Sequence, residues 1–356
     1  MNKPITIAHV VSSLKIGGAE RFVIDLCIAQ QKRTMSPCII SMGAVDDLLV
    51  AEALEQKIPV KVLVGNKAYK QLQMLLSFRK QQVIHVHSPH SLKFMTLMLP
   101  IFRKKKVIYT RHGAATLKSK KWTRFHQFAA PYINAISFVS EESSKNFHLD
   151  HDWNSTPSFV IDNGVNVDNL KPIPTENQVG KVRLGSVGRM VELKNQICLL
   201  QAIDSIDTTT RKGIEVHFFG DGECAPQLKQ FHQARLNDVT IKFHGMQRDR
   251  DQIYNSFDTL VVTSETEGLS IAIIEAMTYQ RSVIATDVGG NPRLVEDNVN
   301  GWLTAFNNPE HLAGCIKQLM AEPALRNGMG IAGREKALLR FSIDATAKKY
   351  EQLYVL

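Results

Sequence analysis

The sequence is poor in cysteine and has no long apolar run, and both absences exclude whole classes of protein. Its five cysteines are scattered without a Cys-x-x-Cys spacing, so we expect reduced core thiols and neither disulfides nor a metal site. The longest apolar stretch, 92–102, is interrupted by Lys93 and Pro100 and is shorter than the roughly 18 residues that a spanning helix needs. The N-terminus lacks the apolar core and cleavage site of a signal peptide, so we expect a cytoplasmic protein.

The fingerprints of two common ligand classes are also missing. The segments LKIGGAER and GSVGRM do not have the Gly-x-Gly-x-x-Gly spacing of dinucleotide-dependent oxidoreductases. No helix-turn-helix, zinc-finger or RNA-binding signature accompanies the basic residues. We therefore expect no nucleic-acid partner.

The charge of the chain is unevenly distributed. Residues 1–165 carry 22 Lys and Arg against 11 Asp and Glu, whereas residues 166–356 carry 21 against 23, so the net charge of +9 comes from the first half. The bases are densest in 102–107 and 117–128, where Trp122 and two phenylalanines stand among them. This pattern predicts a surface suited to anionic lipid or a polyanionic substrate, and ordinary solvated loops are the alternative.

Short β-branched runs alternate with helical patterns from end to end, which predicts parallel sheets covered by helices on both faces. The segment 162–181 is rich in Asn and Pro, has little periodicity and is the natural linker. We therefore expect an α/β protein with two doubly wound domains, 1–165 and 166–340, followed by a last helix. In such sheets ligands bind beyond the carboxyl ends of the strands.

The apolar stretch 269–277 holds a single charged side chain, Glu275. With Gly268 ahead of it and Ser270 near its N-cap, this stretch predicts a helix that is apolar on every side and therefore buried. A buried, ionised carboxylate needs hydrogen-bond donors, and no Lys or Arg lies three or four residues away. The donors come either from the hydroxyl groups of a ligand or from a distant arginine in the core.

Two cations follow the strand expected at 182–187. Arg189 comes directly after Gly188, and Lys194 lies at the start of the next helix. A planar guanidinium and a point charge beside a glycine turn predict a diphosphate site. A surface lysine and an arginine paired with a neighbouring glutamate are the alternative. Later turns add Gly220 and Gly222, which let the backbone approach a ligand.

The first half of the sequence offers fewer candidate ligand-binding residues. Gly17 and Gly18 lie between the first strand and the first helix, where a phosphate or an acceptor would meet bare backbone. His112 ends another strand and faces the cleft expected between the two domains if the sheet runs as expected. Position alone does not distinguish a functional histidine here from a structural one.

Taken together, these motifs resemble glycosyltransferase family 4, the retaining nucleotide-sugar enzymes of the GT-B fold. The likeness extends over almost the whole chain, in segments such as IGGAERF, YTRHG, VGRMVELKN, FFGDGE and EGLSIAIIEAM. Its most specific element is the pair Glu267 and Glu275. The resemblance implies two Rossmann-like domains that face each other across a cleft, with 1–165 binding the acceptor and 166–340 the donor. It also implies that the C-terminal helix in 341–356 packs back on the N-terminal domain.

The resemblance assigns roles to residues of this sequence. Arg189 and Lys194 would bind the diphosphate, Glu267 would hold the donor sugar, and Glu275 would accept hydrogen bonds from the ribose. His112 would contact the sugar from the other domain, which completes the implied catalytic set of Arg189, Lys194, Glu267 and His112. The other donor-site residues that we expect are Gly17, Gly18, Gly188, Gly220, Gly222, Met246, Gly268, Leu269 and Ser270.

The resemblance also implies a mechanism without a protein nucleophile. The acceptor hydroxyl would attack from the face that the nucleotide leaves, and a donor phosphate oxygen would take its proton. Because Arg189 and Lys194 already supply positive charge, we expect neither a metal nor a cofactor. Two Asp-x-Asp pairs, 249–251 and 150–152, are interpreted as incidental, since the first starts a helix and the second follows one.

The resemblance implies the sugar donor and the acceptor only as classes of molecule. We expect a UDP-sugar, with a GDP-sugar as the second choice, and a saccharide or lipid-linked saccharide acceptor in the assembly of bacterial surface polysaccharide. The basic first half suggests peripheral contact with anionic lipid on the cytoplasmic face of the inner membrane. A GT-B-fold sugar-nucleotide epimerase and a non-catalytic nucleotide-sugar-binding protein are the alternatives.

Overall fold

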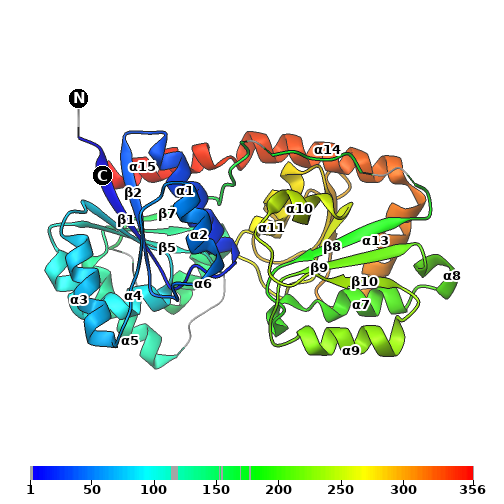
Figure 1. The fold of residues 1–356 in the computed structure, drawn as a ribbon, viewed down its shortest axis with the longest axis horizontal. Helices are drawn as coiled ribbons and strands as arrows, with labels where there is room; N and C mark the ends of the chain where they lie inside the picture. The colour runs from blue at the N-terminus through cyan, green and yellow to red at the C-terminus, as the bar shows by residue number, and fades with distance from the viewer. Residues whose placement is uncertain are drawn as a thin grey trace. The chain divides into compact units, whose positions relative to one another are not determined.

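A computed structural model describes residues 3–113, 119–151, 153, 155–168, 170–175 and 178–355. The chain forms two compact units, of which unit 1 comprises 1–166 with 343–356 and unit 2 comprises 167–342. Each unit is built on one parallel sheet with helices on both faces (Figure 1). The expected pair of doubly wound α/β domains is thereby confirmed.

The sheet of unit 1 has seven strands in the order β3-β2-β1-β4-β5-β6-β7. All neighbouring strands are parallel, as expected for buried strands that are covered by helices on both faces. The strands are β1 (Ile5–Val11), β2 (Met35–Ser41), β3 (Val60–Val62), β4 (Val83–Val86), β5 (Lys106–Arg111), β6 (Ala135–Phe138) and β7 (Ser158–Val160).

Successive side chains of each strand point to opposite faces, and the two faces of this sheet differ in polarity. Ala8 and Val10 of β1 belong to an apolar core shared with the helices α3 to α6. His9, between them, points to the other face, where helices α1 and α15 lie. The helical segments are α1 (Gly18–Gln31), α2 (Leu48–Glu55), α3 (Lys67–Phe78), α4 (Pro89–Met95), η1 (Thr96–Phe102), α5 (Lys120–Ala129), η2 (Ala130–Tyr132), α6 (Glu141–Asp150) and α15 (Ile343–Val355).

The last helix, α15, returns to unit 1 after the chain has completed unit 2. The backbone N–H of Ile343 donates to the carbonyl of Val165 at 2.9 Å, and the Thr346 hydroxyl donates to the carbonyl of Asp162 at 3.1 Å. Figure 1 shows α15, in red, beside α1, in dark blue. The expectation that the C-terminal helix packs on the N-terminal domain is confirmed.

The sheet of unit 2 has six parallel strands in the order β10-β9-β8-β11-β12-β13. Its strands are β8 (Val182–Val187), β9 (Ile214–Phe219), β10 (Thr240–Phe243), β11 (Thr259–Val262), β12 (Ser282–Thr286) and β13 (Gly301–Thr304). Strand β13 is absent from the sequence-based expectation. It is four residues long and begins with glycine, so it lacks the β-branched run that marks the others.

Helices cover both faces of the unit 2 sheet. Apolar residues of α7, α9 and α13 form one core with β8 and β9, and α11 packs with α14 on the other face. The helical segments are η3 (Glu192–Lys194), α7 (Ile197–Asp204), α8 (Thr208–Arg211), α9 (Ala225–Arg235), α10 (Arg250–Asn255), α11 (Ile271–Thr278), α12 (Asn291–Leu294), α13 (Pro309–Ala321) and α14 (Pro323–Arg340).

The expectations about the cysteines and about membrane-spanning helices can be compared with the structure. Three of the five cysteines are buried, two are half-buried, and all five are free thiols. In the described part of the chain, no helix is both long enough and apolar enough to cross a membrane.

Candidate active site

The predicted donor residues of unit 2 lie in the loops that follow its strands. Because all strands are parallel, these loops meet along one edge of the sheet. The N–H of Gly188, after β8, donates to Phe219 at 2.9 Å, and the N–H of Gly220, after β9, donates to Gly245 at 2.8 Å. Gly220 has φ of +129°, and a Cβ there would lie 2.0 Å from the Gly188 carbonyl oxygen. Glycine is therefore required for this close approach of two loops.

Lys194 and Glu267 come together at this edge. Lys194 ends η3 after β8, and Glu267 follows β11, the strand that pairs with β8 where the strand order reverses. The Lys194 ammonium nitrogen lies 2.6 Å from Glu267 Oε1, and the Ser264 hydroxyl donates to the same oxygen at 2.7 Å. Such a reversal point is where doubly wound sheets bind their ligands. The structure thus places a paired cation and carboxylate at the expected position.

The backbone around Glu267 is held tightly. Gly289 has φ of +57°, and a Cβ at this position would lie 1.9 Å from the Glu267 carbonyl oxygen. The Thr263 hydroxyl donates to the carbonyl of Lys194 at 2.9 Å, which ties the loop after β11 to the loop after β8. Both members of the ion pair therefore stand on constrained backbone.

Arg189 is less constrained than Lys194. Its side chain is exposed, and among the described residues it makes no ion pair or side-chain hydrogen bond. Its carbonyl accepts a hydrogen bond from the Gln196 amide at 2.9 Å, which fixes the backbone. The structure therefore places a solvent-facing guanidinium directly after the Gly188 turn without joining it to Lys194 or Glu267.

Glu275 is buried in α11, as the sequence predicts, with 5% of its surface exposed. Its donors come from α10, where the Arg250 Nε atom lies 2.8 Å from Oε1 and the Tyr254 hydroxyl donates to Oε2 at 2.5 Å. A distant arginine, one of the two sources left open by the sequence, is therefore present. A carboxylate has about four acceptor sites, so these two donors leave capacity for a ligand.

The other predicted residues of unit 2 lie close to these side chains in sequence and along the same edge. Ser270 is the N-cap residue of α11, and the buried Gly268 and Leu269 precede it. A Cβ at Gly290 would lie 2.2 Å from the carbonyl oxygen of Gly268, so the loops after β11 and β12 also touch.

Two further donor-site candidates are backbone positions in neighbouring loops. Gly222 has φ of +155° and faces the Met190 carbonyl, where a Cβ would lie at 2.3 Å. Met246 is half-buried in the loop after β10.

In unit 1, His112 lines a hollow of about 260 Å³ at the carboxyl ends of β1, β4 and β5, whereas Gly17 and Gly18 precede the residues of α1 that line it. The order of this sheet also reverses between β1 and β4. The hollow is lined by Ser12, Glu20, His87, Ser88, Arg111 and His112, among others. Gly17 is the N-cap residue of α1, and Gly18 is exposed at the first position of that helix.

His112 is part of a pair of histidines. Its Nε2 atom lies 3.0 Å from Nδ1 of His87, and the two rings stack with centroids 5.3 Å apart. Burial lowers the pKa of His112 to about 4. His112 is therefore a neutral ring at neutral pH. His87 is absent from the predicted site, although the spacing of His85 and His87 would have placed both on one sheet face.

The Asp-x-Asp pairs have local partners. Asp249 caps α10 by accepting a hydrogen bond from the N–H of Gln252 at 3.2 Å, and Asp251 accepts one from the Tyr279 hydroxyl at 2.5 Å. Asp150 ends α6, and Asp152 lies outside the described residues. Among the described residues, the group of side chains with metal-ligand spacing is His9, His85 and His87 in the core of unit 1.

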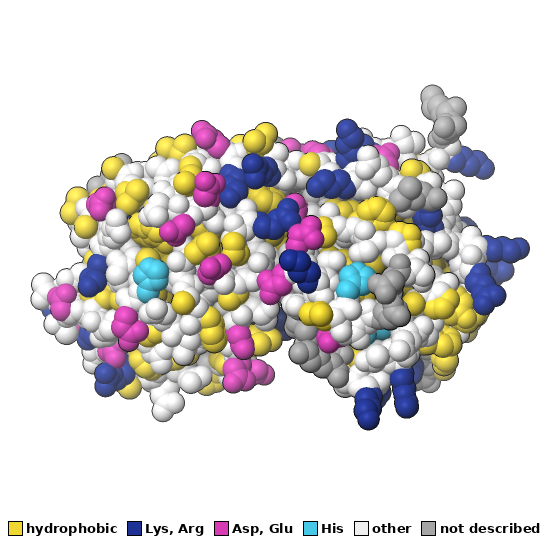
Figure 2. Space-filling model, turned by 180° about the vertical axis from the view of Figure 1, so that it is seen from behind, with side chains coloured by type: hydrophobic (Ala, Val, Ile, Leu, Met, Phe, Trp, Pro, Cys, Tyr) yellow, Lys and Arg dark blue, Asp and Glu magenta, His cyan; other side chains and the backbone are white. Residues whose placement is uncertain are grey.

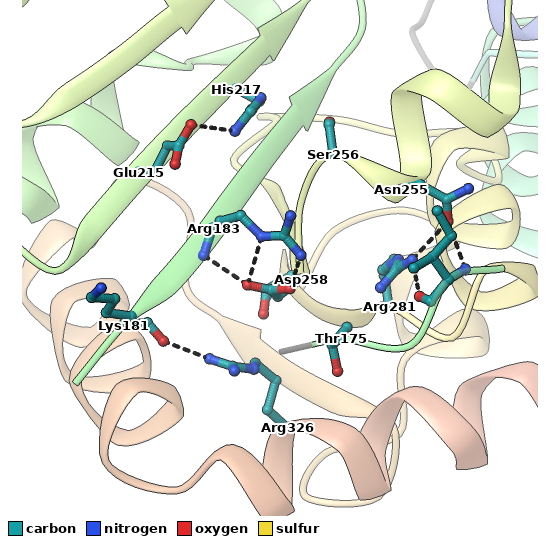
Figure 3. Close-up of polar contacts among 12 residues, drawn as sticks. Thr175, Lys181, Arg183, Glu215, His217, Asn255, Ser256, Asp258, Arg281 and Arg326 are labelled. Carbon is teal, nitrogen blue, oxygen red and sulfur yellow. Dashed lines mark hydrogen bonds and ion pairs between the residues drawn. The ribbon is translucent and has the colours of Figure 1, made fainter. Parts of the chain in front are cut away.

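A second hollow, of about 460 Å³, lies at the amino ends of the unit 2 strands. Figure 3 shows its contacts, in which Arg183 Nη2 lies 2.7 Å from Asp258 Oδ1 and His217 Nε2 lies 3.0 Å from Glu215. Lys242 also pairs with Glu215, at 2.6 Å. The acidic groups of this hollow are thus neutralised by its own bases, at the edge opposite to the predicted donor site.

The fold and the site define a GT-B-type protein with a cation and a carboxylate at the strand-end edge of its second unit. A model of glycosyl transferases group 1 matches residues 171–336, and a model of glycosyltransferase family 4 matches residues 16–169. The chain belongs to glycosyltransferase family 4, a family of retaining enzymes that use nucleotide sugars.

The individual proteins that this chain resembles share only a small fraction of its sequence. The chain is 24% identical over 306 residues to the poly(ribitol-phosphate) alpha-N-acetylglucosaminyltransferase of Staphylococcus aureus, covering 82% of this chain and 61% of that protein. It is 24% identical over 319 residues to an Escherichia coli UDP-Gal:alpha-D-GlcNAc-diphosphoundecaprenol alpha-1,3-galactosyltransferase, covering 83% of this chain and 81% of that one. The crystal structure of Anabaena Alr3699/HepE with UDP-glucose superimposes with a TM-score of 0.86 at 20% identity, covering 99% of this chain and all of that one.

Proposed function

We propose that this protein transfers a sugar, with retention, from a UDP-sugar to a saccharide or lipid-linked saccharide acceptor. The observation that carries the proposal is the Lys194–Glu267 pair, 2.6 Å apart, at the reversal point of the unit 2 sheet. A cation there neutralises the diphosphate that leaves, and the carboxylate binds sugar hydroxyls. The UDP-glucose complex of the similar Anabaena protein and the UDP-galactose donor named for the Escherichia coli relative support uridine as the base.

In this proposal the loops of unit 2 bind the donor. Arg189 and Lys194 hold the two phosphates, and the N–H groups at the start of α11, after Gly268 and Leu269, add positive potential. The ribose hydroxyls donate to Glu275. The bare backbone of Gly188, Gly220 and Gly222, with Met246 beside them, forms the wall of the nucleotide site. Gly17, Gly18 and His112 of unit 1 contact the sugar and the acceptor.

The proposed reaction balances without a group from the protein. The acceptor oxygen forms a bond to the anomeric carbon while the bond from that carbon to the diphosphate oxygen breaks. The acceptor proton moves to an oxygen of the leaving diphosphate, and the bonding electrons leave with UDP. The developing charge lies next to Lys194, so preorganised positive charge is the main contribution of unit 2.

The proposal predicts which donor binds and that no metal is needed. In a thermal-shift screen of UDP-, GDP- and ADP-sugars, we expect a UDP-sugar to raise the melting temperature most, because a ligand that binds the folded state stabilises it. Transfer from that donor is expected to continue at full rate in excess EDTA, since Arg189 and Lys194 supply the cationic charge. Loss of transfer in EDTA and recovery with magnesium or manganese would overturn metal independence.

The same assay separates the proposal from its alternatives. An epimerase would convert the donor sugar without an acceptor, and a binding protein would show a thermal shift without product. Transfer that requires an acceptor and keeps the anomeric configuration, read from the coupling of the anomeric proton by NMR, supports the proposed function. Epimerised donor or unchanged donor contradicts it.

We also place the acceptor at a membrane surface, because unit 1 carries an exposed face that is both apolar and basic. Leu97 and Ile101 of η1 are 77% and 62% exposed, and Phe128 of α5 is 45% exposed. Segments η1, η2 and α5 touch one another, and Arg103 lies over the ring of Tyr132. The other exposed cations of this face are Lys104, Lys120, Lys121 and Arg124.

Figure 2 shows Lys and Arg side chains beside apolar ones on unit 1. Exposed leucine and isoleucine flanked by bases are typical of proteins that bind anionic membranes peripherally. Residues 117 and 118 of the predicted basic stretch lie outside the described residues.

Introducing negative charge on this face provides the test. The double variant Leu97→Glu, Ile101→Glu is expected to lose most of its co-sedimentation with vesicles that contain phosphatidylglycerol, because glutamate is repelled by anionic lipid. Leu339→Glu is the control, since Leu339 of α14 is 80% exposed on unit 2. Equal binding of the native protein to neutral and anionic vesicles would contradict the membrane assignment.

A further inference from the structure

A continuous chain of hydrogen-bonded side chains runs through the core of unit 1 to His112. It begins at the Tyr354 hydroxyl of α15, which accepts from the Gln30 amide at 3.2 Å. The Gln30 oxygen lies 2.8 Å from His9 Nε2, and His9 Nδ1 lies 2.9 Å from His87 Nε2. His87 Nδ1 then lies 3.0 Å from His112 Nε2. Five residues from five separate segments of the fold are thus connected in one line.

The two ends of this chain of hydrogen bonds differ: Gln30 and His9 lie away from the hollow of unit 1, whereas His87 and His112 line it. His9 and Gln30 are fully buried, and His87 is 3% exposed. His87 and His112 also line the hollow of about 260 Å³ in unit 1. The histidines therefore connect Gln30 to this hollow.

The orientation of the Gln30 amide determines which atom donates in each of these hydrogen bonds. Because the Gln30 nitrogen donates to Tyr354, the Gln30 oxygen faces His9, and His9 must carry its proton on Nε2. A neutral imidazole has one donor and one acceptor, so His9 Nδ1 accepts from His87 Nε2. By the same rule, His87 Nδ1 accepts from His112 Nε2. Each ring is thereby assigned the Nε2–H tautomer. His112 Nδ1 is then an acceptor, so the Asn163 side chain must present its amide nitrogen to that atom.

A second branch is consistent with this assignment. The Tyr354 hydroxyl has one proton, and since it accepts from Gln30 it is free to donate to His85 Nδ1 at 2.7 Å. His85 Nε2 then donates to the Thr110 hydroxyl at 2.7 Å. All four histidines of this face therefore share one tautomer, and α15 contributes the group from which both branches start.

Burial keeps these rings neutral. It lowers the pKa of His9 and of His112 to about 4, and it lowers the pKa of His85 and His87 well below the usual range. The hydrogen-bonded histidine rings therefore carry no charge at neutral pH. The titratable or charged groups that surround it are Glu20 and Cys27 of α1, His85 of β4, Arg111 of β5, and Tyr350 and Tyr354 of α15.

We propose that Gln30, His9 and His87 are positioning residues that fix the tautomer and orientation of His112, so that His112 acts on the substrate as a neutral, immobile ring and not as an acid or a base. This inference rests on the proposed function, which places the sugar beside His112. It explains why the C-terminal helix returns to unit 1 with a tyrosine at the end of the chain of contacts. A ring held from behind loses little orientational freedom when the substrate binds.

A metal site is the competing interpretation of the same histidines. Nitrogen atoms of His9, His85 and His87 lie within 4.8 Å of one another. However, both nitrogens of each of these three rings already have a side-chain partner in the structure. Ligation would require breaking at least one of these bonds. Metal analysis of the purified protein decides the point, since a stoichiometric metal ion would overturn the assigned hydrogen-bond chain.

The first test needs no substrate. In ¹⁵N-histidine-labelled protein, long-range ¹H–¹⁵N spectra identify the protonated nitrogen of each ring, and single His→Gln variants assign the signals. We expect the Nε2–H form for His9, His85, His87 and His112, without titration between about pH 5.5 and 8. An Nδ1–H form of His112, or titration within that range, would overturn the proposal even in a protein with normal transfer.

The second test changes Gln30, which is fully buried and does not line the hollow. Gln30→Glu keeps the acceptor for His9 but adds a negative charge, which raises the pKa of His9 and lets a proton spread along the chain to His112. Gln30→Met removes the acceptor. The matched control is Gln31→Glu, because Gln31 is exposed on the same helix and its amide donates to the Lys57 carbonyl at 3.1 Å.

The expected readout is a pH profile. The ratio of kcat/KM of Gln30→Glu to that of the native protein should fall on the order of tenfold as pH decreases from about 8 to 5.5, because the raised pKa is crossed in that direction. The Gln31→Glu ratio should stay flat, and the Kd of UDP should change less than about twofold in all variants. A flat ratio for Gln30→Glu would overturn the proposal. If no donor is transferred, the proposed function fails while the tautomer assignment is still decided by NMR.

The apolar variant Gln30→Met separates positioning from stability. It should lower kcat by several-fold at all pH values without raising the KM of the donor, and Gln30→Glu at pH 8 should retain more activity because it preserves the bond to His9. Equal losses in the two variants, in proportion to their loss of melting temperature, would show a merely structural role.

Discussion

Replacing Lys194 with alanine is expected to lower kcat of sugar transfer by about 100- to 1000-fold, the range found when one preorganised donor to a developing negative charge is removed. The Lys194 side chain is 28% exposed and its ammonium nitrogen lies 2.6 Å from Glu267 Oε1, so it is held in place before the donor arrives. Its charge then acts when the diphosphate leaves. Binding of UDP, measured by calorimetry, should weaken far less than kcat falls.

The control is a lysine on the same sheet that is remote from the strand-end loops. Lys181 is exposed just before β8, and its described contacts are made by the backbone: its N–H donates to Gln178 at 3.3 Å, and its carbonyl accepts from Arg326 at 2.9 Å. Lys181→Ala should therefore transfer sugar at the native rate. Equal melting temperatures of both variants would show that the fold is retained. Turnover of Lys194→Ala within about threefold of the native value would contradict the assigned role.

Ser264 provides a graded comparison. Its hydroxyl donates to the same Glu267 oxygen as Lys194 does, at 2.7 Å, but it carries no charge. If the role of Lys194 were only to orient Glu267, loss of either donor would have a similar effect. We expect Ser264→Ala to reduce kcat much less than Lys194→Ala, because only the lysine contributes charge to the leaving group.

The pairing of Lys194 with Glu267 could be anticipated from the sequence because both follow strands of one parallel sheet. Carboxyl ends of such strands meet at one edge, whatever the detailed register. The pairing of Glu275 with Arg250 could not be anticipated in the same way. No periodicity relates Arg250 to Glu275, which lie on two different helices, and only tertiary packing brings α10 onto α11.

The histidine chain shows another limit of reading residues one at a time. On position alone, a single histidine such as His112 is as compatible with a structural as with a functional role. The alternation in 83–88 puts His85 and His87 on one face, and this signal is present in the sequence. That His9 stands opposite His85, in register on β1, depends on strand order. Strand order is set by the whole fold and cannot be read from local pattern.

Glu275 has two interpretations that make different predictions about the nucleotide. In the structure it joins α10 to α11, through Arg250 and Tyr254, and Tyr254 also stacks on Tyr279 with centroids 5.3 Å apart. In the proposed function it accepts hydrogen bonds from the ribose. Both roles are compatible with one carboxylate, but only the second depends on the ligand.

Glu275→Gln is expected to raise the Kd of UDP by about 10- to 100-fold, because a hydrogen bond to a charged group contributes about 1.5–3 kcal/mol. It also breaks the ion pair with Arg250 and should lower the melting temperature. Arg250→Met and Tyr254→Phe provide the matched controls, since each removes one contact between α10 and α11 and leaves the carboxylate in place. These two variants should lose stability while the Kd of UDP changes by less than about threefold.

The use of 2′-deoxy-UDP makes the comparison independent of stability. The native protein should bind UDP more tightly than 2′-deoxy-UDP, because the deoxy ligand leaves an acceptor site of Glu275 unfilled. In Glu275→Gln this preference should largely disappear, whereas Arg250→Met and Tyr254→Phe should retain it. If the preference for UDP survives in Glu275→Gln, the carboxylate serves only to join α10 to α11, and the ribose must be bound by other groups of unit 2.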